Sequence, residues 1–282
     1  MNTIGRSLIL SILILLPWKT GAVTVTCGTA DISSNSVGNC ECAPSFSEDG
    51  CGACTDPFCG DAKLKGKLAV CNAGCVQQNL NCSACGLYFG SVCRCLKGAP
   101  GCSNNGDWWL LNSHDLISTT KRVPGIVQLG SDNTGWQLGQ TLLAWTGISL
   151  STGTATRKTG TLAVNSVKQR DEEQIHIHVC NRPNNQLRDY LSTKVRPDQF
   201  QSLKPLETSF PEFPTKSVLC QASQTKGDNH VDVAGITADH LNKAKGCDES
   251  QVGAGLITDT NDYSWVCITT GYQSGGQLFC RT

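Results

Sequence analysis

Cysteine spacing is the feature that most restricts what this chain can fold into. Thirteen of the 18 cysteines lie between Cys27 and Cys102, and only five follow, at positions 180, 220, 247, 267 and 280. Such a density in a short stretch is typical of a module that uses disulfides in place of a large core. Both groups are odd in number, so either one bridge joins them or each keeps a free thiol. We favour the joining bridge.

The first 22 residues predict export from the cytosol. Arg6 precedes an apolar run from residue 8 to residue 16, and Thr20-Gly21-Ala22 supplies small residues for cleavage. The run is too short to span a bilayer comfortably. Residues 1–22 are therefore expected to form a cleavable signal peptide rather than a signal anchor. We therefore expect a secreted or lumenal protein whose cysteines are oxidised in pairs.

Two C-x2-C pairs, Cys51-x2-Cys54 and Cys82-x2-Cys85, would suggest zinc in a cytosolic protein. Here the additional cysteines and the export signal favour disulfides, and we expect neither a metal nor a cofactor. Cysteines also share one side of the segment 71–82 at helical spacing, which predicts a short helix.

Charge excludes one class of partner. Lysine and arginine number 23, as do aspartate and glutamate, and the sequence pI is about 6.9. No basic cluster reaches the density of a nucleic-acid footprint, so we expect no nucleic-acid partner. The oligomeric state is not specified by these features.

A polar, turn-forming stretch at 103–107 predicts the boundary between a cysteine-rich module, 23–105, and a second domain, 106–282. In the second domain, short apolar runs separated by Gly, Asn and Ser predict strands at 125–129, 141–150, 161–167, 174–180, 253–258 and 264–269. Two segments predict helices, Asn185 to Val195 and Thr237 to Lys245, the latter with Thr237 as a candidate cap.

These elements together predict an α+β domain, an antiparallel sheet with a few helices. Five tryptophans of this region are expected in the core or on a sheet face rather than on a carbohydrate platform: Trp108, Trp109, Trp136, Trp145 and Trp265.

The segment Gln174-Ile175-His176-Ile177-His178-Val179-Cys180 alternates polar and apolar residues in strict period two. On a strand this places Gln174, His176, His178 and Cys180 on one face, with the imidazoles about 7 Å apart along the strand. The pair has three interpretations: two histidines of an ordinary strand, a pair of metal ligands, or a nucleophile with its neighbour.

A metal site needs further ligands. The next carboxylate, Asp189, falls inside an expected helix, and the next histidine is His230, far along the chain. Nucleophilic attack on phosphorus does not need further ligands. A neutral imidazole nitrogen need not lose a proton before it attacks, and the phosphoimidazolium formed is labile to water. A neighbouring group would then fix the tautomer of the attacking ring.

The stretch Leu162-Ala163-Val164-Asn165-Ser166 followed by Gln174 to Pro183 resembles the histidine-triad superfamily. Within it, the similarity is greatest to CDP-diacylglycerol pyrophosphatases, which carry an Asn-Ser pair shortly before a Gln-Leu-His-Ile-His-Ile-Ser-Cys strand and an Arg-Pro. The segments 227–233, 255–257 and 263–266 also resemble that family. The similarity covers about residues 160–270 and does not include the cysteine-rich module.

The resemblance implies roles for particular residues. If Gln174 stands for the first triad histidine, His176 is the nucleophile and His178 the third member. If Cys180 stands for the third, His178 is the nucleophile. We favour His176. Asn165 resembles the family asparagine that positions phosphate and ribose, with Ser166 and Gln174 as additional donors, and His230 is a candidate pocket residue by position.

The resemblance also implies a fold and an activity. The expected fold is a HIT-like antiparallel sheet preceded by a small disulfide-rich domain. The expected activity is hydrolysis of a nucleotide-linked phosphoanhydride, such as CDP-diacylglycerol to CMP and phosphatidate, with membrane-surface contact through the lipid substrate. The alternative, which the cysteine-rich module favours, is a non-catalytic extracellular binding protein.

Overall fold

The computed structural model describes residues 25–43, 87–111, 115–121, 123, 125–166, 169, 174–244, 246–270 and 275–280. The expected signal peptide, the two C-x2-C pairs and the expected helix over 71–82 lie outside these residues.

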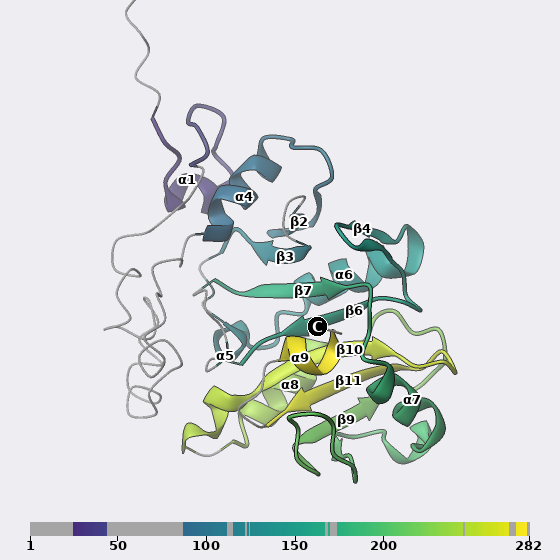
Figure 1. The fold of residues 1–282 in the computed structure, drawn as a ribbon. Helices are drawn as coiled ribbons and strands as arrows, with labels where there is room; N and C mark the ends of the chain where they lie inside the picture. The colour runs from purple at the N-terminus through teal and green to yellow at the C-terminus, as the bar shows by residue number, and fades with distance from the viewer. Residues whose placement is uncertain are drawn as a thin grey trace, which may run out of the picture.

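A nine-stranded sheet forms the centre of the molecule, in the order β1-β2-β3-β7-β6-β10-β11-β9-β8 (Figure 1). All its pairings are antiparallel. The expected α+β class with a large antiparallel sheet is thus confirmed. The strands are β1 (Ser103–Asn105), β2 (Trp108–Leu111), β3 (Leu116–Thr119), β6 (Thr161–Val164), β7 (His176–Cys180), β8 (Lys204–Pro205), β9 (Val218–Ala222), β10 (Gly253–Thr258) and β11 (Ser264–Thr269).

Helices cover both faces of the sheet, and a separate hairpin pairs β4 (Ile148–Leu150) with β5 (Gly153–Ala155). In Figure 1, α7 and α9 lie in front of the sheet, and α6 and α8 lie behind it. The helices are α1 (Thr29–Ser33), α4 (Leu87–Leu96), α5 (Ile126–Leu129), α6 (Thr134–Trp145), α7 (Asn185–Thr193), α8 (Val233–Leu241) and α9 (Gly275–Phe279), with 3-10 turns η3 (Pro197–Gln199) and η4 (Gly246–Gln251).

The two faces of the sheet bury two separate hydrophobic clusters. One cluster combines Ile175, Ile177 and Val179 of the β7 region with residues of α5, α6 and α8. The other combines Ala163 of β6 with residues of α7 and α9. The histidines alternate with the isoleucines along β7, so they belong to the α7 and α9 side.

A third cluster joins the N-terminal segments to the sheet. Buried residues of 25–43 and of α4 pack against Leu111 of β2 and Leu116 of β3. Among the described residues of this part, three disulfides form: Cys27–Cys40, Cys42–Cys93 and Cys95–Cys102. The sequence predicts the domain boundary at position 105. This position is the end of β1, inside the hairpin that β1 forms with β2.

Two further disulfides stabilise the second part, Cys180–Cys280 and Cys220–Cys267. These five bridges indicate an oxidising extracellular or lumenal environment. In the described parts of the chain, no helix has the length and apolar character needed to cross a membrane. The predicted bridge between the two cysteine groups would involve Cys247, whose side chain lies outside the described residues.

Two expected strands are helices. Residues 126–129 form α5, and the first half of 141–150 belongs to α6, with only Ile148–Leu150 in a strand. The buried residues of α6 include Trp136, Gly139 and Leu143, a helical period that begins upstream of the apolar run. The run from Thr141 alone hides this period, and the strand prediction was therefore wrong.

Two smaller expectations are also corrected. Helix α8 begins at Val233, because the Asp232 side chain caps it by accepting from Gly235 N at 2.9 Å, while the Thr237 hydroxyl donates to Val233 O within the helix. Trp108, Trp136 and Trp265 are buried as expected, whereas Trp145, at the end of α6, is 78% exposed.

Candidate functional site

Strand β7 places His176 and His178 side by side on the face of the sheet covered by α7 and α9. Their ring centroids lie 4.9 Å apart, with the ring planes at 78° to each other. His176 is 5% exposed and His178 is partly exposed. The period-two pattern therefore produces the predicted pair of neighbouring imidazoles.

The strands on both sides of β7 place side chains beside the two rings. Ser118 of β3 lies opposite His176, and His178 lies between Leu116 of β3 and Ala163 of β6. Side chains directly opposite each other in antiparallel strands lie on the same face, so these three side chains flank the imidazoles. The Ser118 hydroxyl donates to Ile175 O at 2.8 Å and is thereby directed to the backbone.

A backbone carbonyl fixes the tautomer of His176. Its Nδ1 lies 2.9 Å from Gln174 O, which can only accept a hydrogen bond. Nδ1 therefore carries the proton, and in the neutral ring the lone pair resides on Nε2.

Asn165 links His178 to α9. Its Oδ1 accepts from Gly276 N at 2.9 Å, which directs the amide nitrogen Nδ2 toward His178 Nε2 at 3.4 Å. An amide nitrogen only donates, so His178 Nε2 is the acceptor of this contact. The structure brings together the predicted residues His176, His178 and Asn165.

Gln174 and Ser166, the two further predicted donors, are both buried. The Gln174 amide nitrogen donates to Thr119 O at 2.7 Å, so this donor is directed into the sheet. The Ser166 hydroxyl is fully buried and, among the described residues, has no hydrogen-bond partner.

His230 does not lie beside the histidine pair. Its neighbour Val231 packs in the cluster on the opposite face of the sheet, with Ile175 and Ile177. The His230 side chain is exposed, and its backbone N–H donates to Asp228 Oδ1 at 2.9 Å. His230 was predicted as a pocket residue only from its position in the sequence. It lies in the loop before α8, away from the histidine pair.

Helix α9 covers this face of β6, and the sequence did not reveal it. Figure 1 shows α9 in front of β6 and β10. The Cys180–Cys280 disulfide fixes its end, and Asn184 N donates to Phe279 O at 3.0 Å. A Cβ at Gly275 would overlap Val164 O, so this close approach requires glycine. The sequence features that could have indicated α9 are Cys280 and the preceding pair Gly275-Gly276.

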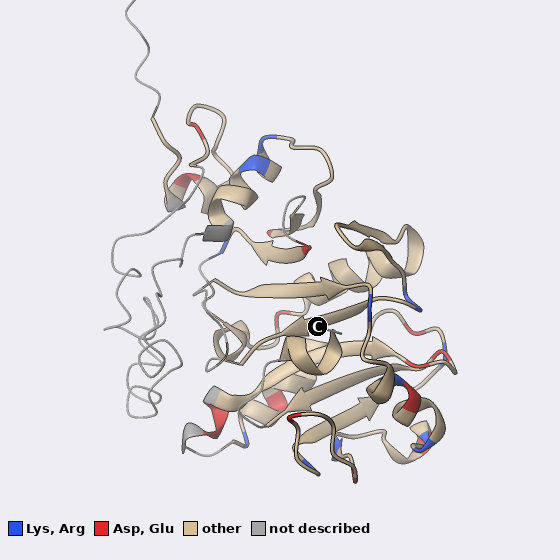
Figure 2. Cartoon of the chain, viewed as in Figure 1, with Lys and Arg blue, Asp and Glu red and all other residues tan. Residues whose placement is uncertain are grey.

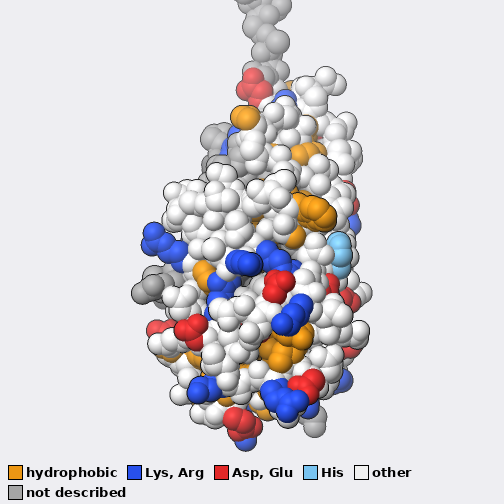
Figure 3. Space-filling model, turned by 90° about the vertical axis from the view of Figure 1, so that its right-hand side faces the viewer, with side chains coloured by type: hydrophobic (Ala, Val, Ile, Leu, Met, Phe, Trp, Pro, Cys, Tyr) orange, Lys and Arg blue, Asp and Glu red, His pale blue; other side chains and the backbone are white. Residues whose placement is uncertain are grey.

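The four central strands β6, β7, β10 and β11 contain no Lys, Arg, Asp or Glu, and Figure 2 shows them without charged residues. On the molecular face drawn in Figure 3, basic and acidic side chains both occur among neutral ones. A ligand beside the histidines would therefore be held on these strands by neutral donors and by imidazole.

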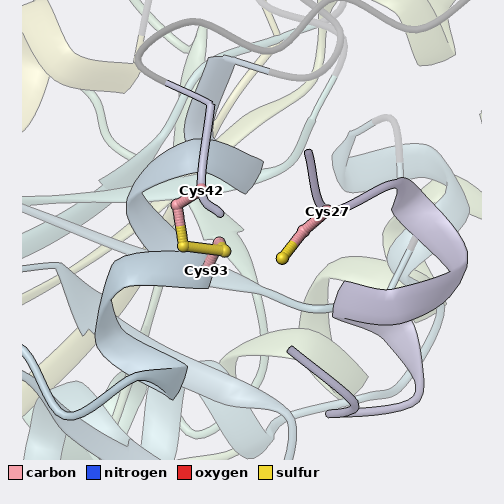
Figure 4. A group of neighbouring side chains, drawn as sticks. All are labelled: Cys27, Cys42 and Cys93. Atoms are coloured by element: carbon pink, nitrogen blue, oxygen red, sulfur yellow. A yellow bond between two sulfur atoms is a disulfide. The ribbon is translucent and has the colours of Figure 1, made fainter. Parts of the chain in front are cut away.

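One cluster of potential metal ligands lies in the N-terminal part. Figure 4 shows Cys27 beside the Cys42–Cys93 bridge, and the three sulfur atoms lie within 4.8 Å of one another. Cys27 is itself bonded to Cys40. Metal binding by cysteine requires a thiolate, and these sulfurs are held in disulfides. The cluster is therefore the place where two bridges pass close to each other.

No protein-family model fits the chain, and no curated protein is significantly similar to it.

Proposed function

We propose that this chain is a secreted or lumenal hydrolase of a nucleotide-linked phosphoanhydride, with chemistry like that of the histidine-triad superfamily. The observation that carries the proposal is the hydrogen bond from His176 Nδ1 to Gln174 O, which leaves the lone pair on Nε2. CDP-diacylglycerol is the substrate that the sequence resemblance favours, with CMP and phosphatidate as products.

The reaction has two steps. His176 Nε2 attacks the phosphorus that carries the nucleoside, and the bond from that phosphorus to the bridging oxygen breaks, which releases phosphatidate. Water then attacks the same phosphorus, the nitrogen–phosphorus bond breaks, and CMP leaves. Gln174 O stabilises the positive ring of the intermediate through Nδ1–H, and no external oxidant or cofactor is needed.

The contacts of the pair favour His176 over His178 as nucleophile. Nε2 of His178 accepts from the amide nitrogen of Asn165 at 3.4 Å, whereas Gln174 O holds the proton on Nδ1 of His176 and would stabilise that ring as an imidazolium. Cys180 is bonded to Cys280 and has no thiol proton to share, so it is poorly suited to replace a triad histidine. In this assignment Asn165 and the buried Ser166 hydroxyl are donors for phosphoryl oxygens.

The test is CMP release by the oxidised mature protein from CDP-diacylglycerol in detergent micelles and from a soluble CDP ester. We expect His176→Ala to lower kcat at least about 100-fold. His178→Ala should also lower it. The control, His240→Gln, changes a histidine of α8 on the opposite face and should keep full activity.

Circular dichroism must show each variant to be folded. Full activity in His176→Ala with loss in His178→Ala would reassign the nucleophile, and full activity in both would remove the mechanism. A folded wild-type protein that hydrolyses neither substrate would favour the non-catalytic binding protein instead.

A further inference from the structure

A groove of about 350 Å³ lies away from the histidine pair. Its wall includes Ile148 and Leu150, which belong to the cluster that also holds Ile177. Ile177 points to the opposite face of β7 from His176 and His178, so the groove is separate from the candidate active site. Its volume is at the lower end of the range of small-molecule sites, about 300–1,000 Å³.

Covalent and hydrogen-bonded links shape the groove. Pro100 and Gly101 form one side, within the short loop closed by the Cys95–Cys102 disulfide. Strand β4 forms the other side and is paired with β5. The Cys95–Cys102 disulfide therefore constrains one wall, and the pairing of β4 with β5 constrains the other.

Asp115 is the charged side chain among the described residues that line the groove. Ser151 holds its carboxylate, through Ser151 N to Oδ1 at 3.2 Å and the Ser151 hydroxyl to Oδ2 at 2.7 Å. The Asp115 backbone oxygen accepts from Val179 N at 2.9 Å. A carboxylate has about four lone-pair sites. Two are used here, so the oriented carboxylate can accept hydrogen bonds from a ligand.

Trp145, at the end of α6, is 78% exposed, one of two large hydrophobic residues exposed in the described parts of the chain. Leu142 and Thr146, which line the groove, are three residues before and one residue after it. Residues three apart on a helix are neighbours on its surface, so Trp145 and Leu142 are neighbours on α6. Tryptophan is enriched at binding surfaces, where its ring offers both an apolar face and a polar edge.

From these features we propose that the groove binds a neutral carbohydrate. The apolar C–H face of a sugar ring would stack on Trp145, and its hydroxyl groups would donate to the Asp115 carboxylate. Ser103, Thr146 and Ser149 add hydroxyls to the lining, and none of the described lining residues carries a positive charge. Anionic ligands are therefore disfavoured, and a ligand rich in hydroxyl donors fits the acceptor that the groove presents.

The experiment titrates the oxidised mature protein with soluble cello-, xylo-, manno- and chito-oligosaccharides, followed by calorimetry and by iodide quenching of tryptophan fluorescence. We expect at least one series to bind with a Kd of about 1 mM or tighter and to protect Trp145 from iodide. Trp145→Ala should weaken binding at least tenfold, or by about 1.4 kcal/mol. Trp145→Tyr, which keeps an aromatic face, should retain part of it.

Two further variants locate the binding. Asp115→Asn should weaken it, and asparagine tolerates the positive φ of 47° at this position. Gln137→Ala, on the exposed side of α6, is the matched control and should bind as the wild type does. The proposal is overturned if none of the four series binds, if Trp145→Ala binds equally well, or if the groove binds extended peptides in preference to the sugars.

Discussion

Neighbouring groups determine the protonation of single residues in this protein. Gln174 O does so for His176, and hydrogen bonds from Trp108 and Thr134 do so for Asp132. Asp132 Oδ2 accepts from Trp108 Nε1 at 3.2 Å, and Oδ1 accepts from Thr134 N at 3.0 Å. Burial raises the pKa of this carboxyl, but the hydrogen bonds from Thr134 and Trp108, with the charge of Lys121, outweigh burial and lower it below 3.8.

This shift predicts how stability responds to acid. Because the folded pKa is depressed, the ionised carboxylate stabilises the fold above its unfolded pKa, and this contribution is lost as pH falls through the folded pKa. Asp132→Asn should therefore be less stable than wild type at neutral pH, with a difference that shrinks below about pH 4. Urea unfolding at about pH 7 and about pH 3 measures it, and an equal difference at both would contradict the assignment.

At the scale of elements, α6 depends on close approach to the sheet. A Cβ at Gly135 would overlap the indole of Trp108, which is 1% exposed on β2. Alanine favours a helix over glycine by about 1 kcal/mol, but overpacking a rigid ring costs about 1–3 kcal/mol.

We therefore expect Gly135→Ala to lower the free energy of unfolding despite its higher helix propensity. Gln137→Ala, two residues on and exposed, should change it by less than about 0.5 kcal/mol. Chemical denaturation of both variants tests the packing. A stabilised Gly135→Ala protein would show that helix propensity, and not the contact with Trp108, determines stability at this position.

The elements that the sequence predicts are those with a strong local signal. Strands β10 and β11 match their predicted bounds, and β7 follows from the alternation around His176. Helix α6 was missed because two positions on its buried face, Gly135 and Gly139, are glycines and therefore interrupt the apolar period in the sequence. Helix α9 was missed because tertiary links, the Cys280 disulfide and the Gly276 contact with Asn165, hold five residues in place. The histidine pair could thus be predicted, but the helix that covers Asn165 could not.

For the whole molecule, disulfides that close long loops should contribute most to stability. Cys180–Cys280 spans 100 residues and ties the end of α9 to β7, whereas Cys27–Cys40 spans 13. Loop-closure entropy grows with length, so replacing both Cys180 and Cys280 by serine should lower the free energy of unfolding by about 2–4 kcal/mol.

The corresponding change at Cys27 and Cys40 is the comparison and should cost less. Chemical denaturation of the two double variants, both otherwise oxidised, gives the result. Equal losses would show that strain or local packing, rather than the length of the closed loop, determines what each bridge contributes.

The most direct test of the proposed mechanism is to trap the nucleotide on the protein. Oxidised protein is mixed with CDP-diacylglycerol labelled in the cytidine, quenched with base within one turnover, and digested for mass spectrometry. We predict an acid-labile, base-stable CMP adduct on His176, unchanged by chelators and absent from His176→Ala. Turnover without any adduct, stopped by chelation and restored by zinc or manganese, would show that the two imidazoles are metal ligands and would contradict the account.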